Sequence, residues 1–402
     1  MEYRKDRSGK PLSILGYGCM RFTKKNNRID VDKAEKEVME AFRKGVNYFD
    51  TAYIYPGNEV ALGEILRRTG IRDEINIATK LPHYLVRTRS GIDRIFNEEL
   101  SRLSTDRIDY YLIHFLTDIS QWEKLKKLGI GQWIEEKKKE GKIRNIGFSF
   151  HGNTEQFLSI LEDYDWDFTM IQYNYLDEHA QAGRKGLARA AEKGIPFMIM
   201  EPLRGGRLVD FLPREAKKLI RENGHGYTPA ELALRWIWDQ PEVTCVLSGM
   251  NSPEMVEENC RIASDAKAGH LTEEDHELVD QVREAVLASM QIPCTECGYC
   301  MPCPRGVDIP GNFRSYNRMG TEGRSSARRE FFQSIGLGTP PAFASQCNGC
   351  GRCESHCPQS ISIREQLKVA DKALRPAPYR IGLAVARKIM IRKRKERKRK
   401  ED

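Results

Sequence analysis

Residues 47–55 read Asn-Tyr-Phe-Asp-Thr-Ala-Tyr-Ile-Tyr, and this stretch joins a short apolar run to a loop. We expect a strand over Asn47–Asp50, followed by a loop that carries Tyr55. Similar apolar runs recur through the first 270 residues, and segments of helical period separate them. The predicted strands are Ser13–Gly18, Asn47–Asp50, Ile75–Lys80, Tyr110–His114, Asn145–Ser149, Thr169–Tyr173, Pro196–Met200 and Thr244–Leu247.

The regular alternation of strands and helices decides the expected fold class. Apolar residues at helical spacing predict helices such as Val31–Arg43 and Gly91–Leu103. Eight strand–helix units in roughly 260 residues predict an α/β fold of the (β/α)8 barrel type. The alternative is an open, doubly wound sheet, but no Gly-x-Gly-x-x-Gly fingerprint follows the first predicted strand. Before that strand, Ser8-Gly9 predicts a short hairpin that would close the barrel floor.

Three polar residues end consecutive predicted strands: Asp50, Lys80 and His114. In a parallel barrel these strand ends share one rim, where catalytic side chains gather. Tyr55 follows in the loop after Asp50. A phenol has a pKa near 10, and a neighbouring ammonium favours the phenolate, so we expect Lys80 to lower the pKa of Tyr55. With Asp50 holding Lys80, and His114 donating to a carbonyl oxygen, this set suits the protonation of an alkoxide during hydride transfer.

These residues resemble the signature of the aldo-keto reductases over about residues 1–265. The matching stretches are Asn47–Ala52, Tyr55, Asn58-Glu59, Leu62-Gly63, Ala78–Lys80, Asp109–His114 and Gly147–Ser149. The resemblance implies a TIM barrel that binds NADP or NAD without a Rossmann fold. It also implies a catalytic tetrad of Asp50, Tyr55, Lys80 and His114.

The same resemblance implies positions for the nicotinamide cofactor. Ser149 and Gln172 match residues that bind the carboxamide, and Pro202 and Leu203 match the loop over the cofactor. Ser252 opens the last barrel helix, where free N–H groups favour an anion, and Glu258 and Asn259 match adenine-contacting positions.

Some positions depart from the family pattern. Phe150 stands where Asn is frequent, and Met200 stands where an aromatic residue stacks on nicotinamide. The positions for cations that bind a 2′-phosphate hold Gly249 and Met255, so the choice between NAD and NADP stays open. Arg204 and Arg207 are alternative partners for that phosphate.

Eight of the eleven cysteines form two runs near the C-terminal end, each closed by Cys-Pro. Three thiolates at i, i+3 and i+6 wrap one [4Fe-4S] cluster, and the fourth Cys reaches the other cluster. We therefore predict two [4Fe-4S] clusters, the first held by Cys294, Cys297, Cys300 and Cys357, and the second by Cys347, Cys350, Cys353 and Cys303. Zinc is the alternative, but it does not explain triplets that end in Cys-Pro. The first run has two residues rather than three before its last cysteine, Cys303. The assignment of Cys303 to the second cluster is therefore the less secure of the two cross-ligations.

The runs are separated by residues 304–346, in which Phe313–Tyr316 and Ala327–Ile335 have helical patterns. This arrangement resembles the small, mostly α-helical two-cluster ferredoxin domains that are fused to larger redox enzymes. A helix over Glu273–Met290 is expected before it. We expect a barrel over residues 1–270, a two-cluster domain over 271–375 and a basic tail over 376–402.

The expected function is an oxidoreductase that moves hydride between a nicotinamide cofactor and a carbonyl or alcohol. The clusters would exchange electrons with a partner such as ferredoxin or another electron carrier. Nicotinamide transfers two electrons and each cluster takes one, so a flavin could bridge them, although the sequence holds no flavin motif. Two alternatives stay open: a carbonyl reductase with structural or sensory clusters, and an electron-transfer subunit with a non-catalytic barrel.

Composition and charge indicate the cellular compartment of the protein and the possible partners of its tail. No run of about 18 apolar residues appears, and the N-terminus is charged, so we expect a cytoplasmic protein with reduced thiols. Cys19, Cys245 and Cys260 lie singly and are interpreted as buried small hydrophobic residues. Residues 376–402 hold eleven Lys or Arg and three Asp or Glu. Their net charge of +8 equals that of the whole chain. A solvated tail is expected; peripheral contact with an anionic membrane is the alternative, and nucleic acid is not expected as a partner.

Overall fold

The computed structural model describes residues 1–402 except 27, 153, 180, 295–297, 322, 337–340, 378, 381 and 383–402. The chain forms two compact units. The barrel unit comprises Met1–Asp210 and Ile220–Val279, and the C-terminal unit comprises Phe211–Leu219 and Asp280–Asp402. The predicted boundary after residue 270 stays a prediction, because this division falls later and also moves a short internal segment into the C-terminal unit.

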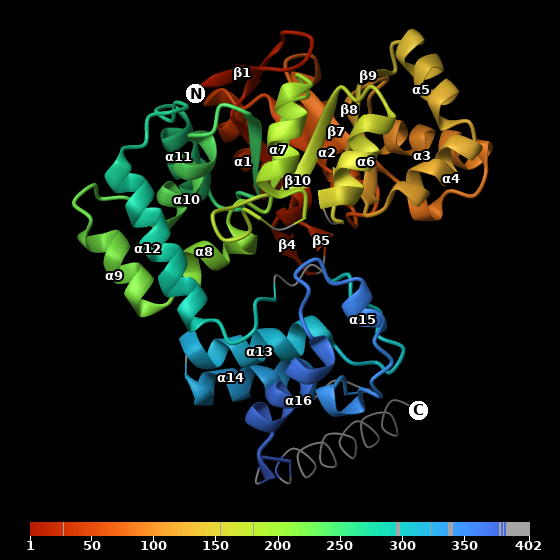
Figure 1. The fold of residues 1–402 in the computed structure, drawn as a ribbon. Coiled ribbons are helices and arrows are strands. Elements are labelled where there is room, and N and C mark those ends of the chain that lie inside the picture. Colours follow the sequence, from red (N-terminus) through yellow and green to blue (C-terminus); the bar gives the residue numbers. More distant parts are fainter. Residues whose placement is uncertain are drawn as a thin grey trace, which may run out of the picture. The chain divides into compact units, whose positions relative to one another are not determined.

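Eight parallel strands close into a barrel, in the order β10-β11-β12-β3-β6-β7-β8-β9 (Figure 1). This closure confirms the predicted (β/α)8 fold and excludes the open sheet. The strands are β3 (Leu15–Gly18), β6 (Tyr48–Asp50), β7 (Asn76–Pro82), β8 (Ile108–Leu116), β9 (Ile143–Phe150), β10 (Phe168–Gln172), β11 (Phe197–Met200) and β12 (Val243–Ser248).

Helices connect the strands and cover the outside of the barrel. In α1, the N-cap Asp30 accepts from the N–H of Lys33, and Ala34, Val38 and Ala41 form the buried face. The barrel helices are α1 (Val31–Arg43), α2 (Asn58–Thr69), α3 (Arg89–Arg102), α4 (Ile119–Lys127), α5 (Ile130–Lys139), α6 (Thr154–Asp163), α7 (Gly183–Glu192), α8 (Arg207–Asp210), α10 (Pro229–Trp238) and α11 (Pro253–Ala263). Two further helices, α9 (Arg214–Glu222) and α12 (Glu273–Ser289), contain the points at which the chain passes between units.

A hairpin of β1 (Tyr3–Lys5) and β2 (Pro11–Ser13) precedes the first barrel strand, as the Ser8-Gly9 turn predicts. Leu12 of β2 is fully buried in the same core cluster as Tyr48 and Tyr110 of the barrel strands. The Tyr110 hydroxyl donates to Asp6 at 2.6 Å. The hairpin is therefore part of the barrel core, at the amino ends of the strands.

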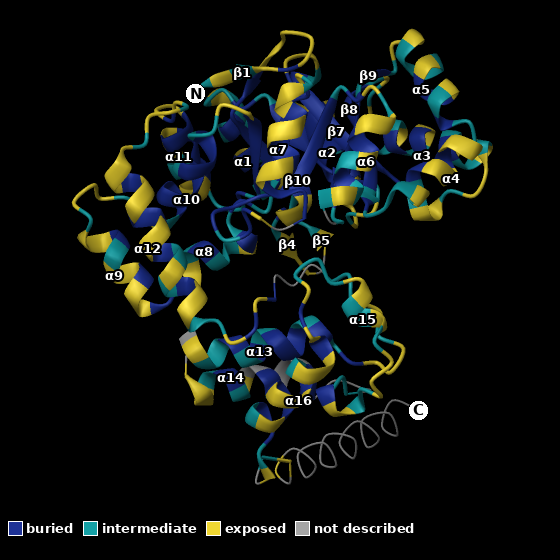
Figure 2. Ribbon diagram, viewed as in Figure 1, coloured by how far each residue is buried: buried dark blue, intermediate teal, exposed yellow. Residues whose placement is uncertain are grey.

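The C-terminal unit is built from short helices around a small apolar core. Its helices are α13 (Ile309–Thr321), α14 (Arg324–Phe331), α15 (Arg352–Ser355) and α16 (Ile363–Leu374), with short turns η5 (Phe332–Gly336) and η6 (Ala344–Gln346). Phe313, Phe331 and Leu367 are fully or almost fully buried in its core (Figure 2). Cysteines of both runs pack directly against this core.

The basic tail cannot be assigned a structure, because residues 383–402 lie outside the described residues. Among the helices that are described, none combines the length and the apolar character that crossing a membrane requires.

Candidate active site and cluster sites

Asp50 and Lys80 form the centre of the candidate active site at the carboxyl ends of β6 and β7. These strands pair in parallel, with Asp50 opposite Ala78. Lys80 follows two residues further along β7. The Lys80 ammonium donates to both carboxylate oxygens of Asp50, at 2.6 and 2.7 Å, and to the backbone oxygen of Thr51 at 2.6 Å. Both side chains are buried. An ion pair this enclosed keeps a fixed geometry.

Tyr55 and His114 complete the set. A backbone bond from Tyr55 N–H to Ala52 O, of 2.9 Å, shapes the loop between β6 and α2. The Tyr55 ring centroid lies 5.4 Å from Lys80 Nζ and 6.2 Å from that of His114, with the Tyr55 and His114 rings nearly perpendicular. The structure thus brings together the four predicted side chains. Lys80 and His114 each lie two residues before the end of their strands, because β7 and β8 are longer than predicted.

Burial and charge act in opposite directions on Lys80. Burial by itself would lower the pKa of the ammonium, but Asp50 and Tyr55 raise it, and the net pKa is above its usual value. Burial raises the pKa of the Asp50 carboxyl, and Lys80 opposes that effect. The directions are consistent with a Lys80 ammonium that stays protonated beside an ionised Asp50.

The expected acidification of Tyr55 is wrong in its net direction. Burial raises the pKa of the phenol above 10, and the lowering effect of Lys80 is smaller than that of burial. His114 shows the reverse shift: burial, Lys80 and His83 lower the pKa of its imidazole to about 3. At neutral pH the site therefore holds a protonated phenol and a neutral imidazole.

Ser149 and Gln172 lie at the ends of neighbouring strands β9 and β10, and both are buried. Ser149 Oγ accepts from the N–H of Phe115 at 2.8 Å, which leaves its hydroxyl hydrogen to donate. The Gln172 amide donates to Asp177 at 2.9 Å and accepts from Gln181 at 3.1 Å, which leaves its second N–H. Two such donors fit the chemistry of a carboxamide oxygen.

Pro202 and Leu203 follow β11 and open the loop that contains η4 (Arg204–Gly206). Arg204 is buried, and its Nε lies 3.1 Å from Asp177. Asp177 in turn accepts from Gln172 and from the amide of Asn174 at 2.9 Å. Arg204 therefore supports the network behind Gln172, and this placement does not favour a 2′-phosphate as its partner.

The last barrel helix begins where the sequence predicts. Ser252 is its N-cap and accepts from the N–H of Met255 at 3.3 Å. The Asn259 amide donates to Ser248 at 2.9 Å, and Glu258 accepts from the Thr228 hydroxyl at 2.7 Å. Both side chains have partners within the protein, so their adenine contacts stay predictions.

Two residues at this rim were not singled out from the sequence for a functional role. The His151 ring lies 4.9 Å from that of Phe115, and burial, then His114, lowers the pKa of its imidazole. Cys19 is fully buried, and burial, then Asp50, raises the pKa of its thiol. Each follows the last residue of a barrel strand, and that position was the signal that the sequence offered. Cys245 and Cys260 are also buried, as predicted.

Cysteines from both runs line one cavity in the C-terminal unit. Cys294, Cys300 and Cys357 share it with apolar residues that include Ile309 and Phe313. These cysteines are three of the four ligands predicted for the first cluster. The fourth, Cys297, lies outside the described residues. An apolar cavity that collects thiols from distant parts of the chain fits an iron–sulfur cluster.

The remaining four cysteines are those predicted to hold the second cluster. Cys347 Sγ accepts from the N–H of Gly349 at 3.4 Å, Cys350 is exposed, and Cys353 is part of α15. Cys303 packs with Cys347 and Cys353 against the shared core. All ten described cysteines are free thiols, which fits soft thiolate ligation. No three His, Cys, Asp or Glu side chains within the described ranges are arranged to hold a single ion.

Two family models match different parts of this chain. Residues 14–284 match the aldo/keto reductase family, and residues 293–362 match the 4Fe-4S dicluster domain. An aldo-keto reductase of Mycobacterium avium is 28% identical over 260 residues, which are 62% of this chain and 79% of that protein. The NADH-specific methylglyoxal reductase of Escherichia coli is 26% identical and covers 65% of this chain and 90% of its own length.

A solved structure has the same architecture. The holo form of an aldo-keto reductase from Bacillus halodurans superposes with a TM-score of 0.58 at 27% identity. It covers 70% of this chain and 96% of its own. The similarity therefore extends over nearly the whole of that protein.

Proposed function

Because the chain belongs to the aldo/keto reductase family and carries a 4Fe-4S dicluster domain, we propose that it couples carbonyl chemistry to electron transfer. The protein is an oxidoreductase. Its barrel interconverts a carbonyl and an alcohol with a nicotinamide cofactor, and its clusters exchange electrons with a partner.

The observation that carries this proposal is the geometry around Lys80. Its ammonium is held between Asp50 and Thr51, and it lies near the ring of Tyr55 (5.4 Å to the centroid). Tyr55 is therefore the general acid that protonates the substrate oxygen. Lys80 stabilises the phenolate that remains, and neutral His114 orients the oxygen by donating a hydrogen bond.

Residues of the neighbouring strand ends would hold the cofactor, which supplies or accepts the hydride. Ser149 and Gln172 would bind its carboxamide, and Pro202, Leu203, Ser252, Glu258 and Asn259 would line the rest of its length. Gly249 and Met255 offer no cation for a 2′-phosphate, which favours NADH. The similar Escherichia coli protein is described as NADH-specific.

The cysteines would hold two [4Fe-4S] clusters, which supply one-electron transfer when bound. Cys294, Cys297, Cys300 and Cys357 would hold the first, and Cys347, Cys350, Cys353 and Cys303 the second. The cavity that Cys294, Cys300 and Cys357 share supports this division.

Replacing Tyr55 by Phe tests the barrel chemistry. We expect Tyr55→Phe to lower kcat for carbonyl reduction by about 10²- to 10⁴-fold, because the acid is removed while the ring remains. Tyr53→Phe is the matched control, since the Tyr53 hydroxyl bonds Glu98 at 2.8 Å, outside the tetrad. Turnover that survives in Tyr55→Phe would contradict the proposal and favour a barrel without this catalysis.

Anaerobic absorbance spectra test the link between barrel and clusters. The holoprotein should contain about eight irons, and addition of NADH and an acidic ferredoxin should reduce the ferredoxin. If NADH supports carbonyl turnover but reduces neither clusters nor ferredoxin, the clusters are structural or sensory.

A further inference from the structure

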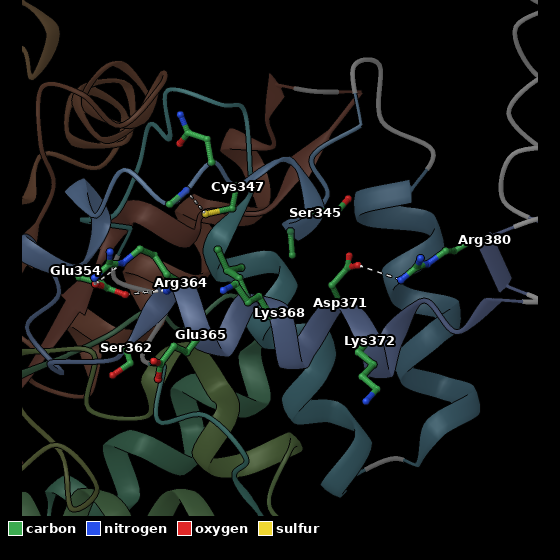
Figure 3. Close-up of a pocket in the computed structure, with 14 residues that line it drawn as sticks. Ser345, Cys347, Glu354, Ser362, Arg364, Glu365, Lys368, Asp371, Lys372 and Arg380 are labelled. Carbon is green, nitrogen blue, oxygen red and sulfur yellow. Dashed lines mark hydrogen bonds and ion pairs between the residues drawn. The ribbon is translucent and has the colours of Figure 1, made fainter.

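A groove of about 1010 Å³ runs along α16 in the C-terminal unit and reaches Cys347 of the second cysteine run (Figure 3). Its lining comes from η6, the loop that carries Cys347 and Gly349, α15 and α16. Whatever binds in this groove comes close to a predicted cluster ligand.

Three cations form a stripe on α16: Arg364, Lys368 and Lys372 recur every four residues and are exposed. Residues at this spacing lie on one face of a helix. Ile363, Ala370 and Leu374 are buried and anchor the helix to the core of the C-terminal unit. The stripe therefore points to solvent along three turns of the helix.

The acids that line the groove are largely neutralised. Glu354 pairs with Arg364 at 2.7 Å, and Asp371 pairs with Arg375 at 2.6 Å. Arg380 lies 3.7 Å from Asp371 and adds a second cation there. These pairs leave the groove with a surplus of positive charge.

Lys368 and Lys372 carry that surplus. Within the described part of the chain, neither forms an ion pair, and Glu365 is the remaining acid in the lining. Unpaired cations that face solvent suit recognition of an acidic protein surface.

The sequence that follows strengthens the same charge. Arg380 lines the groove, and residues 383–402 after it include ten of the eleven Lys and Arg of the basic tail. A net positive charge raises the rate at which acidic partners associate with a protein.

One cysteine of the second run is exposed, whereas the described cysteines of the first run are buried or partly buried. Cys294 is buried in the apolar cavity with Phe313, whereas Cys350 is exposed. Electrons can pass between proteins only where a cluster lies near the surface. The second run meets this condition beside the groove.

We propose that the α16 groove is the docking surface for a small, acidic, one-electron carrier protein of the ferredoxin class. Lys368 and Lys372 make the principal contacts, and bound carrier lies beside the cluster that Cys347 helps to hold. This inference rests on the proposed electron exchange and locates it on the chain.

Titration calorimetry of the anaerobic full-length holoprotein with an oxidised acidic two-cluster ferredoxin tests the proposal. Wild type should bind, and binding should weaken as salt rises. The double charge reversal Lys368→Glu with Lys372→Glu should weaken binding about tenfold or more, because like charges then face each other. Lys368→Gln with Lys372→Gln should give an intermediate loss, and this neutral pair replaces the reversal if the reversal lowers the iron content.

Lys127→Glu with Lys139→Glu is the matched control. These lysines are exposed on α4 and α5 of the barrel unit, and the double change alters net charge by the same amount. Affinity for ferredoxin should stay within about twofold of wild type, since neither lysine lines the groove.

Three results would overturn the proposal: no binding by wild type, equal weakening by both reversals, or unchanged affinity in the groove variants. Sedimentation with phosphatidylserine vesicles adds a fourth, because a groove reversal that abolishes vesicle binding but leaves ferredoxin binding intact would make the groove a lipid site. The titration needs no turnover, so failure of Tyr55 as the acid would leave its result unchanged.

Discussion

The barrel rim and the cysteine-rich part of the C-terminal unit hold their functional side chains in different ways. At the rim, Lys80 is fixed by three hydrogen bonds, two to Asp50 and one to Thr51, on strands that the barrel itself aligns. In the C-terminal unit, Cys350 is exposed and Cys353 is half-buried, on short elements. The barrel site is held by bonds between its own side chains and backbone, whereas we expect a bound cluster to fix the arrangement of the cysteines.

The two cores show the same difference. The barrel interior packs large side chains from many strands, such as Tyr48, Tyr110 and Phe168. The core of the C-terminal unit is smaller, and cysteines form part of its wall. Small domains of this kind depend on metal or disulfide cross-links, because they bury too little apolar surface.

Removal of iron should therefore unfold the C-terminal unit and leave the barrel folded. This is the largest effect that we expect. Metal binding contributes directly to the folding free energy of small metal-binding domains, so a chelator with a mild oxidant should unfold the C-terminal unit. Proteolysis should then cleave residues 280–382, while tryptophan fluorescence stays native. All five tryptophans lie in the barrel unit: Trp122, Trp133, Trp166, Trp236 and Trp238. A C-terminal unit that resists protease without iron would remove the contrast.

Replacement of a lysine by Met compares the two regions at one residue type. Lys80→Met leaves Asp50 buried without its cation, and we expect a loss of about 3–5 kcal/mol in the unfolding free energy of the barrel. Lys368→Met, on the exposed face of α16, should change stability by less than about 0.5 kcal/mol. Urea denaturation followed by tryptophan fluorescence and by circular dichroism measures both. Equal effects would mean that the Lys80–Asp50 pair does not hold the rim together.

The smallest expected effect is that of pH on carbonyl reduction. The pKa of His114 is lowered to about 3, so its imidazole is neutral throughout the physiological range. The pKa of Tyr55 is raised, so the acid form persists and kcat for reduction should stay level between about pH 6 and 8. Alcohol oxidation needs the phenolate, and its rate should rise about tenfold per pH unit. A fall in reduction across neutral pH would show that another group, or a lower pKa of Tyr55, controls the step.

Local pattern predicted much of the fold. The helix α1 has the predicted limits Val31–Arg43, because its N-cap and apolar spacing are local signals. The ends of β7 and β8 were missed by two residues, since pairing with neighbouring strands extends them past Lys80 and His114. The association of Phe211–Leu219 with the C-terminal unit was also missed, because that contact joins segments far apart in the chain.

The candidate active site was also predictable only in part. Residue type and spacing predicted that Asp50, Tyr55, Lys80 and His114 lie together, since strands of a parallel barrel end at one rim. The net pKa shift of Tyr55 was not predictable, because it depends on how much water the fold removes from the phenol. The role of Arg204 was also missed, since its partner Asp177 lies on a different loop.

The order of strands and helices, the four polar residues of the rim and the two cysteine runs were determined by the sequence alone. They depend on periodicity and spacing, which are local properties of the chain. Tertiary structure decided that Lys368 lines a groove beside Cys347, and that burial outweighs the effect of Lys80 on the pKa of Tyr55. These facts depend on distance and desolvation between segments remote in sequence, which exist only once the chain has folded.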